Sequence, residues 1–381
     1  MTTPDRWGHL SPVQIVFGPG SVHEVPRMVS DRTLLVTTRG AVGRGVASQV
    51  LHGLDAPVLF DAARSNPTLD AVDAAVSELR GRGIEALIGL GGGSVIDLAK
   101  VLSLALAVKD FEVRRMLDAG HSWIESRPLP MIAVPTTAGT GSEVTPFATL
   151  WDADARRKVS VETPNLHPKA AVVDPELATT LPWDVTLSTG LDAFSQCIEA
   201  LLNRRATTET DELALRGIRL VPPALRALSA GSNPGSRRDM AEAALLSGLA
   251  ISRTRTGLAH SMSYPITAHL GLDHGLACAM NLPAVVAFNA EVAPVAVAPI
   301  ARALGGNAPE DAVTAILGLY TELGVADLIR ERVRSIDRVR PLVGEMLTPG
   351  RADNNLRPVH PGDIDRLLDR TQRWLEGSLV A

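Results

Sequence analysis

The sequence predicts an α/β domain with a parallel sheet, followed by an all-helical domain. In the first half, short apolar runs alternate with amphipathic helical stretches and glycine-rich turns, which is the pattern of βαβ units. After about residue 181, helical stretches follow one another and strand-like segments are scarce. Pro182 lies at this change in pattern, so we expect one domain over residues 1–182 and a second over residues 183–381.

The elements of the first domain follow from its apolar runs, taken in order along the chain. Three helices are predicted in the second half from apolar residues at helical spacing. The expected strands are TLLVTTRG (33–40), APVLFD (56–61), EALIGLGGGS (85–94) and LPMIAVPTTAGTGSE (129–143), with helices over LDAVDAAVSELRGRG (69–83) and VIDLAKVLSLALAV (95–108). The helices of the second half are expected over residues 184–203, 211–230 and 238–254.

Composition excludes several function classes. The net charge is −5 with no basic stripe, so we expect no nucleic acid as a partner. No run of about 18 apolar residues predicts a membrane span, and the N-terminal sequence lacks the pattern of a signal peptide. Two cysteines in 381 residues fit a reducing compartment, and we expect a cytoplasmic protein that has no membrane partner.

Two loops at strand ends are candidate nucleotide-binding elements. Gly91, Gly92, Gly93 and Ser94 lie between a strand and a helix, where glycines let the backbone approach a phosphate and the helix N-terminus offers free N–H groups. A tight turn without a ligand explains this loop equally well. The second loop, residues 136–143, carries hydroxyl and amide groups suited to ribose, phosphate or nicotinamide.

Three of the nine histidines fall within LAHSMSYPITAHLGLDHG (258–275). His260 and His274 are separated by a proline and a glycine, so we expect a helix end and a new helix to bring their rings together. Upstream, Asp192 and Gln196 are four residues apart and share one face of a helix. These four side chains form an oxygen and nitrogen donor set suited to Fe²⁺, Zn²⁺ or another divalent ion. Taken alone, the histidines fit helix caps or core positions better than ligands.

The sequence resembles the iron-containing (group III) alcohol dehydrogenases over nearly its whole length. The motifs that carry this resemblance are GGGSVIDLAK, PTTAGTGSEVTPFATL, AVVDPEL, GLDAFSQCIEA and GLAHSMSYPITAHLGLDHG. The resemblance implies a Rossmann-like N-terminal domain, a helical C-terminal domain, and nucleotide and metal in the cleft between them. The family typically binds its metal through one Asp and three His, of which Asp192, His260 and His274 match three.

Two positions depart from the family pattern. Gln196 stands where the family usually has a histidine, and its amide oxygen is a weaker, neutral ligand. Tyr264 stands where many members have another histidine close to the nicotinamide. Because a tyrosine still donates or relays a proton, we expect Tyr264 to be a catalytic residue. His269 is expected to be structural.

The resemblance also implies a nicotinamide cofactor on the first domain. Thr38 replaces the acidic residue that in this family commonly favours NAD, and Arg39 beside it could pair with a 2′-phosphate. We therefore expect NADPH to be used at least as well as NADH. The alternative is that Arg39 points to solvent and that the enzyme accepts both nucleotides. The expected cofactor-binding residues are Thr38, Arg39, Asn66, Gly91, Gly92, Gly93, Ser94, Asp97, Thr136, Thr137, Thr140 and Lys158.

Arg255, just before His260, indicates a small anionic aldehyde as substrate, although an ordinary surface arginine explains it as well. With Gln196 and the segments TRTG, HSMSYP and GLDHG, the chain looks most like phosphonoacetaldehyde reductases of phosphonate antibiotic biosynthesis, which form 2-hydroxyethylphosphonate. General alcohol dehydrogenases and maleylacetate reductases are the alternatives. Two further alternatives remain. One is a dehydroquinate synthase, a related enzyme that shares the fold but catalyses a lyase reaction, and the other is a catalytically silent nucleotide-binding module. A homodimer is a further expectation.

Overall fold

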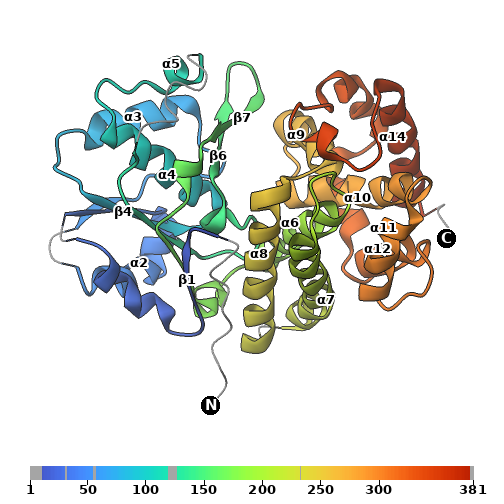
Figure 1. The fold of residues 1–381 in the computed structure, drawn as a ribbon, viewed down its shortest axis with the longest axis horizontal. Helices are drawn as coiled ribbons and strands as arrows, with labels where there is room; N and C mark the ends of the chain where they lie inside the picture. Colours follow the sequence, from blue (N-terminus) through green and yellow to red (C-terminus); the bar gives the residue numbers. More distant parts are fainter. Residues whose placement is uncertain (1–10, 31, 55–56, 119–126, 232, 378–381) are drawn as a thin grey trace. The chain divides into compact units, whose positions relative to one another are not determined.

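The computed structural model describes residues 11–30, 32–54, 57–118, 127–231 and 233–377. Two expectations fall partly outside this range: the start of the chain, where no signal peptide is expected, and Ala56 at the start of an expected strand. The chain divides into two compact units (Figure 1). The first consists of Met1–Thr137 and Gly141–Thr180, and the second of Ala138–Thr140 and Leu181–Ala381. The boundary between the two units therefore lies after Thr180, two residues before the boundary expected from the sequence.

The first unit is built on a six-stranded parallel sheet with strand order β1-β8-β5-β4-β2-β3. Leu34 and Val36 of β2 pack into one hydrophobic cluster with α3 (Leu69–Leu79) and α4 (Gly93–Ala107), whereas Leu35 packs into a second cluster with α2 (Val46–Leu51). Both faces of the sheet are thus covered (Figure 1), as expected for parallel strands. The strands are β1 (Gln14–Phe17), β2 (Thr33–Val36), β3 (Val58–Phe60), β4 (Ala86–Gly91), β5 (Met131–Pro135) and β8 (Ala170–Val173).

In the described part of the first unit, five α-helices, several short 3-10 helices and one hairpin accompany the sheet. The antiparallel hairpin of β6 (Phe147–Asp152) and β7 (Arg157–Glu162) was not predicted, and neither were β1 and β8. Along β6, buried and half-buried residues alternate, so it is a strand with one side on the core. The helices are α1 (Arg39–Gly43), α2 (Val46–Leu51), α3 (Leu69–Leu79), α4 (Gly93–Ala107) and α5 (Val113–Asp118).

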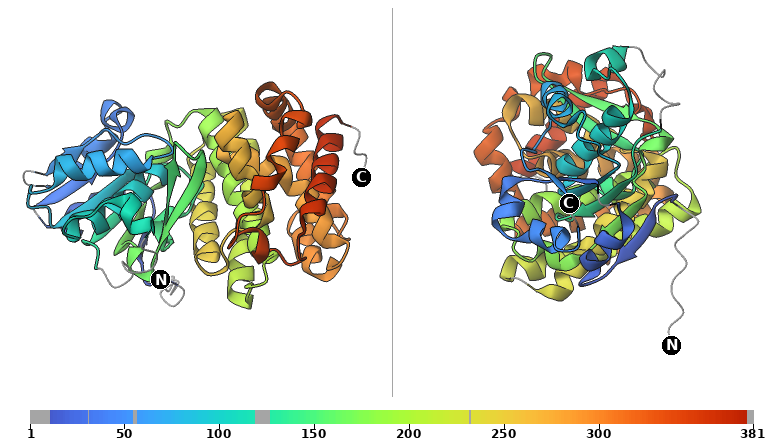
Figure 2. Two further views of the ribbon diagram at one scale, coloured as in Figure 1. Left: turned by 90° about the horizontal axis from the view of Figure 1, so that it is seen from above. Right: turned by 90° about the vertical axis from the view of Figure 1, so that its left-hand side faces the viewer.

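The second unit is helical, so the predicted fold class is confirmed. Its long helices α6, α7 and α8 lie side by side (Figure 2), and α10 packs against both α6 and α9. No single described helix has the length and hydropathy of a membrane span, although α12 and α13, bent by 76°, meet these criteria as a pair. The helices are α6 (Trp183–Leu201), α7 (Thr208–Ala230), α8 (Pro234–Thr254), α9 (Leu258–Leu270), α10 (His274–Ala290), α11 (Pro294–Ala303), α12 (Asp311–Glu322), α13 (Val325–Val333) and α14 (Pro361–Leu375).

The turn between α9 and α10 positions both candidate histidine ligands. Gly271 ends α9 in the left-handed region, with φ of 67°, a conformation that glycine adopts without strain. His274 is the first residue of the new helix. As expected from the sequence, the helix containing His260 ends and a second one begins at His274. The proline at 265 lies inside α9 and does not end it.

Candidate metal centre and nucleotide-binding loops

Three helices of the second unit bring four potential metal ligands together. Asp192 lies on α6, and His260 lies in the first turn of α9. His274 begins α10, and Cys278 follows one turn later. One donor atom from each residue lies within 4.8 Å of those of the other three. Asp192 Oδ1 is 3.1 Å from His260 Nε2 and 3.9 Å from His274 Nε2. A carboxylate, two imidazoles and a thiol are all ligands of divalent transition metals, so these residues fit a bound ion.

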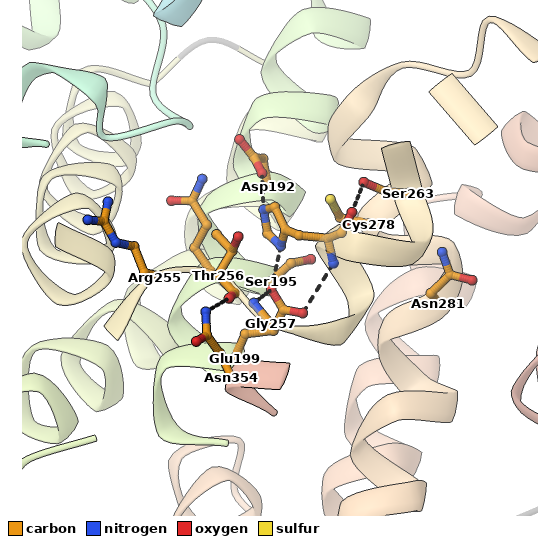
Figure 3. A network of polar contacts seen from close by, with 12 residues as sticks. Asp192, Ser195, Glu199, Arg255, Thr256, Gly257, Ser263, Cys278, Asn281 and Asn354 are labelled. Carbon is orange, nitrogen blue, oxygen red and sulfur yellow. Dashed lines mark hydrogen bonds and ion pairs between the residues drawn. The ribbon is translucent and has the colours of Figure 1, made fainter. Parts of the chain in front are cut away.

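Glu199 fixes the orientation of the His260 ring. Its carboxylate contacts His260 Nδ1 and accepts hydrogen bonds from the backbone N–H groups of Gly257, at 3.1 Å, and His260, at 3.2 Å (Figure 3). With Nδ1 engaged in this way, Nε2 is directed at Asp192. A carboxylate behind a histidine is the usual support of a metal-binding imidazole. Burial alone would lower the pKa of His260, but the charges of Cys278 and Glu199 and the hydrogen bond with Asp192 raise it above its usual value.

Glu199 is not among the site residues expected from the sequence, although the sequence contains a signal for it. Glu199 follows Asp192 by seven residues and Gln196 by three, so all three share one face of α6. Cys278 likewise follows His274 by four residues and shares one face of α10 with it. In each case the spacing identifies a shared helix face, but only the packed structure shows that this face meets the other ligands.

Gln196, the expected fourth ligand, is buried and already hydrogen-bonded within the protein. Its Oε1 accepts a hydrogen bond from the Ser247 hydroxyl at 2.8 Å, and its Nε2 lies 3.5 Å from the carbonyl oxygen of Thr140. Ser247, on α8, carries no sequence signal that would have singled it out. The amide thus links α6 to α8 and to the 138–140 segment, which belongs to the second unit rather than the first.

Tyr264 lies beside the candidate metal ligands, whereas His269 does not. The Tyr264 ring stacks on that of His274, with ring centroids 5.9 Å apart and an angle of 24° between the planes. Tyr264 is one turn after His260 on α9, and it is buried. His269 instead pairs with Glu345, at 3.0 Å from Nε2, which agrees with its expected structural role.

Arg255 ends α8 in an unusual backbone conformation. Its φ of 68° and ψ of 174° lie in a region that is almost restricted to glycine. The Arg255 carbonyl oxygen accepts hydrogen bonds from Asn203 Nδ2, at 3.3 Å, and from Thr254 Oγ1, at 2.9 Å. Figure 3 shows its side chain directed away from Cys278. Burial, together with the nearby charge of Arg351, lowers the pKa of Arg255 to about 10, so the guanidinium stays charged at neutral pH.

In the first unit, the Gly91–Gly93 loop packs against Thr137, at the start of the second glycine-containing loop. A side chain at Gly91 would bring its Cβ to 2.5 Å from Val95, and one at Gly92 would lie 3.1 Å from the Thr137 hydroxyl. Glycine is therefore required where β4 enters α4. Asn66 joins this group, because its backbone N–H donates to the Ser94 hydroxyl at 3.2 Å. The N-terminus of α4 thus has the backbone geometry that binds phosphate groups.

Behind these loops lies a buried polar network centred on Lys100. The ammonium group of Lys100 donates to Ser142 Oγ, Thr145 Oγ1 and the carbonyl oxygen of Phe147 at 2.8–3.1 Å. Asp97 accepts from the Ser142 hydroxyl at 2.5 Å and from the Thr149 N–H at 2.8 Å. Burial lowers the pKa of Lys100 to about 8. The structure thus shows Asp97 hydrogen-bonded within the protein, where it joins α4 to β6.

Four of the remaining predicted cofactor residues lie at three places: the start of α1, strand β7 and the end of β5. Thr38 is the N-cap of α1, and its hydroxyl accepts from the Ala41 N–H at 3.1 Å. Arg39 is exposed, with Nε 3.9 Å from Asp61 Oδ1, so an acidic side chain does lie near this strand edge, although not at position 38. Lys158 is on β7, and Thr136 is buried directly after β5.

Comparison with known proteins identifies the family. The model for the iron-containing alcohol dehydrogenase domain matches residues 12–175, and the C-terminal domain model of Fe-containing alcohol dehydrogenases matches residues 186–371. The chain belongs to the iron-containing alcohol dehydrogenase family. A 4-hydroxybutyrate dehydrogenase from Cupriavidus necator is 33% identical, over 95% of this chain and 98% of the relative.

Solved structures agree with this family assignment. A 1,3-propanediol oxidoreductase has a TM-score of 0.89 and 28% identity, covering 95% of this chain and 98% of that one. A sulfoacetaldehyde reductase from Bifidobacterium kashiwanohense, in complex with NAD⁺, has a TM-score of 0.85 and 28% identity, covering 97% and 98%. The chain is therefore an enzyme of the alcohol dehydrogenase class. This confirms the family and enzyme class that the sequence motifs predicted.

Proposed function

We propose that this dehydrogenase is a metal-dependent, NAD(P)H-linked reductase of a small anionic aldehyde. Phosphonoacetaldehyde, reduced to 2-hydroxyethylphosphonate, is the substrate we favour. The observation that carries this proposal is Arg255, a charged and half-buried side chain five residues before His260. Two similar proteins support an anionic substrate, because 4-hydroxybutyrate carries a carboxylate and sulfoacetaldehyde a sulfonate.

The side chains of the second unit have distinct roles in this proposal. When bound, a divalent ion polarises the aldehyde oxygen and a nicotinamide supplies the hydride. Asp192, His260 and His274 would hold the ion, with Glu199 keeping the His260 ring in place. The Tyr264 hydroxyl would donate the proton that the product oxygen requires. Gln196 was the fourth ligand expected from the sequence, but its hydrogen bond with Ser247 leads us to a different candidate below.

Arg255→Ala tests the substrate proposal. We expect kcat/KM for phosphonoacetaldehyde to fall more than about tenfold further than that for neutral acetaldehyde, because truncating a buried charge contact costs roughly 2–5 kcal/mol. Steady-state kinetics with both aldehydes and one batch of each protein provide the measurement. Acetaldehyde serves as the control, since any loss of fold or metal would lower both values alike. Equal losses on the two aldehydes would assign Arg255 a purely structural role.

We also propose that the first unit binds NADPH at least as well as NADH. No carboxylate stands at position 38 to repel a 2′-phosphate, and Arg39 beside it is exposed, with its Nε 3.9 Å from Asp61 Oδ1. Thr38→Asp should shift the ratio of kcat/KM values towards NADH, because a carboxylate there repels the phosphate and binds the ribose hydroxyls. Aspartate also caps helices, so α1 should be preserved, and Thr38→Ser is the neutral control. A wild-type enzyme that strongly prefers NADH would contradict this proposal.

A further inference from the structure

Cys278 is a potential ligand that the sequence motifs did not indicate. Its sulfur lies 3.9 Å from His274 Nε2 and within 4.8 Å of the donor atoms of Asp192 and His260. Cys278 is fully buried. Because it follows His274 by four residues on α10, both side chains lie on the same face of the helix. Figure 3 shows the thiol on the same side of the cluster as Ser263.

The spacing of the four donor atoms suits one small ion. With metal–ligand bonds of roughly 2.0–2.3 Å, tetrahedral ligands lie about 3.3–3.8 Å from one another. The observed separations are 3.1 Å between Asp192 and His260, 3.9 Å between Asp192 and His274, and 3.9 Å between His274 and Cys278. These three separations differ from the tetrahedral values by a few tenths of an ångström, and the other three are at most 4.8 Å, so shifts of about 1 Å or less would close this cluster around a metal.

Gln196 is the weaker candidate for the fourth ligand. Its oxygen already accepts a hydrogen bond from Ser247, and a neutral amide oxygen binds a borderline-soft ion less strongly than a thiolate does. At position 196, where the family usually has a histidine, this chain thus has an amide that is hydrogen-bonded within the protein. The Cys278 thiol on α10 instead lies within the cluster.

We propose that the Cys278 thiolate is the fourth protein ligand of the metal, together with Asp192, His260 and His274. This inference rests on the proposed function only in assuming that these residues bind a divalent ion. On binding, the thiol releases its proton to solvent and the resulting thiolate sulfur donates an electron pair to the ion. Zinc also accepts a fifth donor, so four protein ligands leave room for a substrate.

The second cysteine provides a matched control. Cys197 is also fully buried, but it lies on α6 against Gly217 of α7, where an added Cβ would be 2.5 Å from its sulfur. It is not part of the four-residue cluster. The described residues include both cysteines of the chain, so a thiolate signal from the metal is assigned by replacing one or the other.

Cobalt titration of the metal-free enzyme tests the proposal. Thiolate ligation of Co²⁺ produces an intense near-ultraviolet charge-transfer band, which carboxylate and imidazole ligands do not. We expect this band in the wild type and in Cys197→Ala, and its loss in Cys278→Ala together with an affinity loss of more than about tenfold. Gln196→His combined with Cys278→Ala should recover affinity without recovering the band.

X-ray absorption of the zinc-loaded wild type keeps the test independent of how the variants fold. A sulfur neighbour at about 2.3 Å is the expected result, and a first shell of nitrogen and oxygen alone would overturn the proposal. So would a cobalt band that survives in Cys278→Ala. A zinc–sulfur bond in an enzyme that reduces no aldehyde would instead reject the proposed function and leave the Cys278 assignment standing.

Discussion

His260→Ala is expected to lower kcat/KM for aldehyde reduction by more than about 100-fold. Replacing a residue that only supports a metal ligand typically lowers metal affinity or activity about 10- to 100-fold, so the loss of a ligand itself should cost more. The substitution removes the imidazole that lies between Asp192 and Glu199. Two buried carboxylates would then face each other without a positive or hydrogen-bonding group between them. Elemental analysis after dialysis against the metal measures how much metal the variant retains. NADH-linked kinetics measure the remaining activity.

His269→Ala is the matched control for this experiment. His269 lies on the same helix, but it pairs with Glu345 instead of the cluster. Metal content and activity should therefore stay close to those of the wild type. If His260→Ala retained its metal and its activity, or if strong chelation left the wild type fully active, the assignment of this cluster as the metal centre would be wrong.

Gly275→Ala is expected to destabilise the second unit by about 3 kcal/mol or more, at the upper end of overpacking effects. A Cβ at this position would lie 1.8 Å from the carbonyl oxygen of Ser188 and 2.6 Å from its carbon. These are backbone atoms of α6, so no side-chain rotation relieves the clash. Separating α10 from α6 would also move His274 away from Asp192, so we expect metal binding to weaken as well.

Thermal unfolding, with and without added metal, measures this effect. A loss of 3 kcal/mol corresponds to a fall in Tm of roughly 6–12 °C for a unit of this size. Gly318→Ala is the control, because Gly318 also lies inside a helix but has open space around its Cβ position. Alanine should be neutral or mildly stabilising there. An unchanged Tm for Gly275→Ala would show that the two helices separate without cost.

The sequence predicts the parts of the fold that have strong periodicity. The apolar run of β4 with its glycine loop, and the amphipathic helix α3, were both identified from local patterns. The short strands β1 and β8, of four residues each, were not, because such runs carry little periodic signal. The hairpin of β6 and β7 was not predicted either, because the second predicted loop, residues 136–143, ends before β6 begins at Phe147 and no strand was expected after it.

The candidate site was predictable to the extent that family motifs mark it. Asp192 and His260 follow from those motifs, whereas Glu199 and Cys278 required knowledge of which helix faces meet. Helical spacing indicates neighbours on one helix, but contacts between α6, α9 and α10 depend on packing across many residues. The hydrogen bond that occupies Gln196 involves Ser247, 51 residues away, and no local pattern indicates it.

The backbone of Arg255 has a consequence for protein engineering. At φ of 68° and ψ of 174°, a non-glycine residue costs on the order of 1–3 kcal/mol, so glycine at this position would make the helix end more stable. Screening a library of variants for heat resistance alone would therefore enrich glycine at position 255. The enriched variants would lack the guanidinium that we propose binds the substrate anion. Thermostability and substrate selectivity thus conflict at this position, and both have to be selected together.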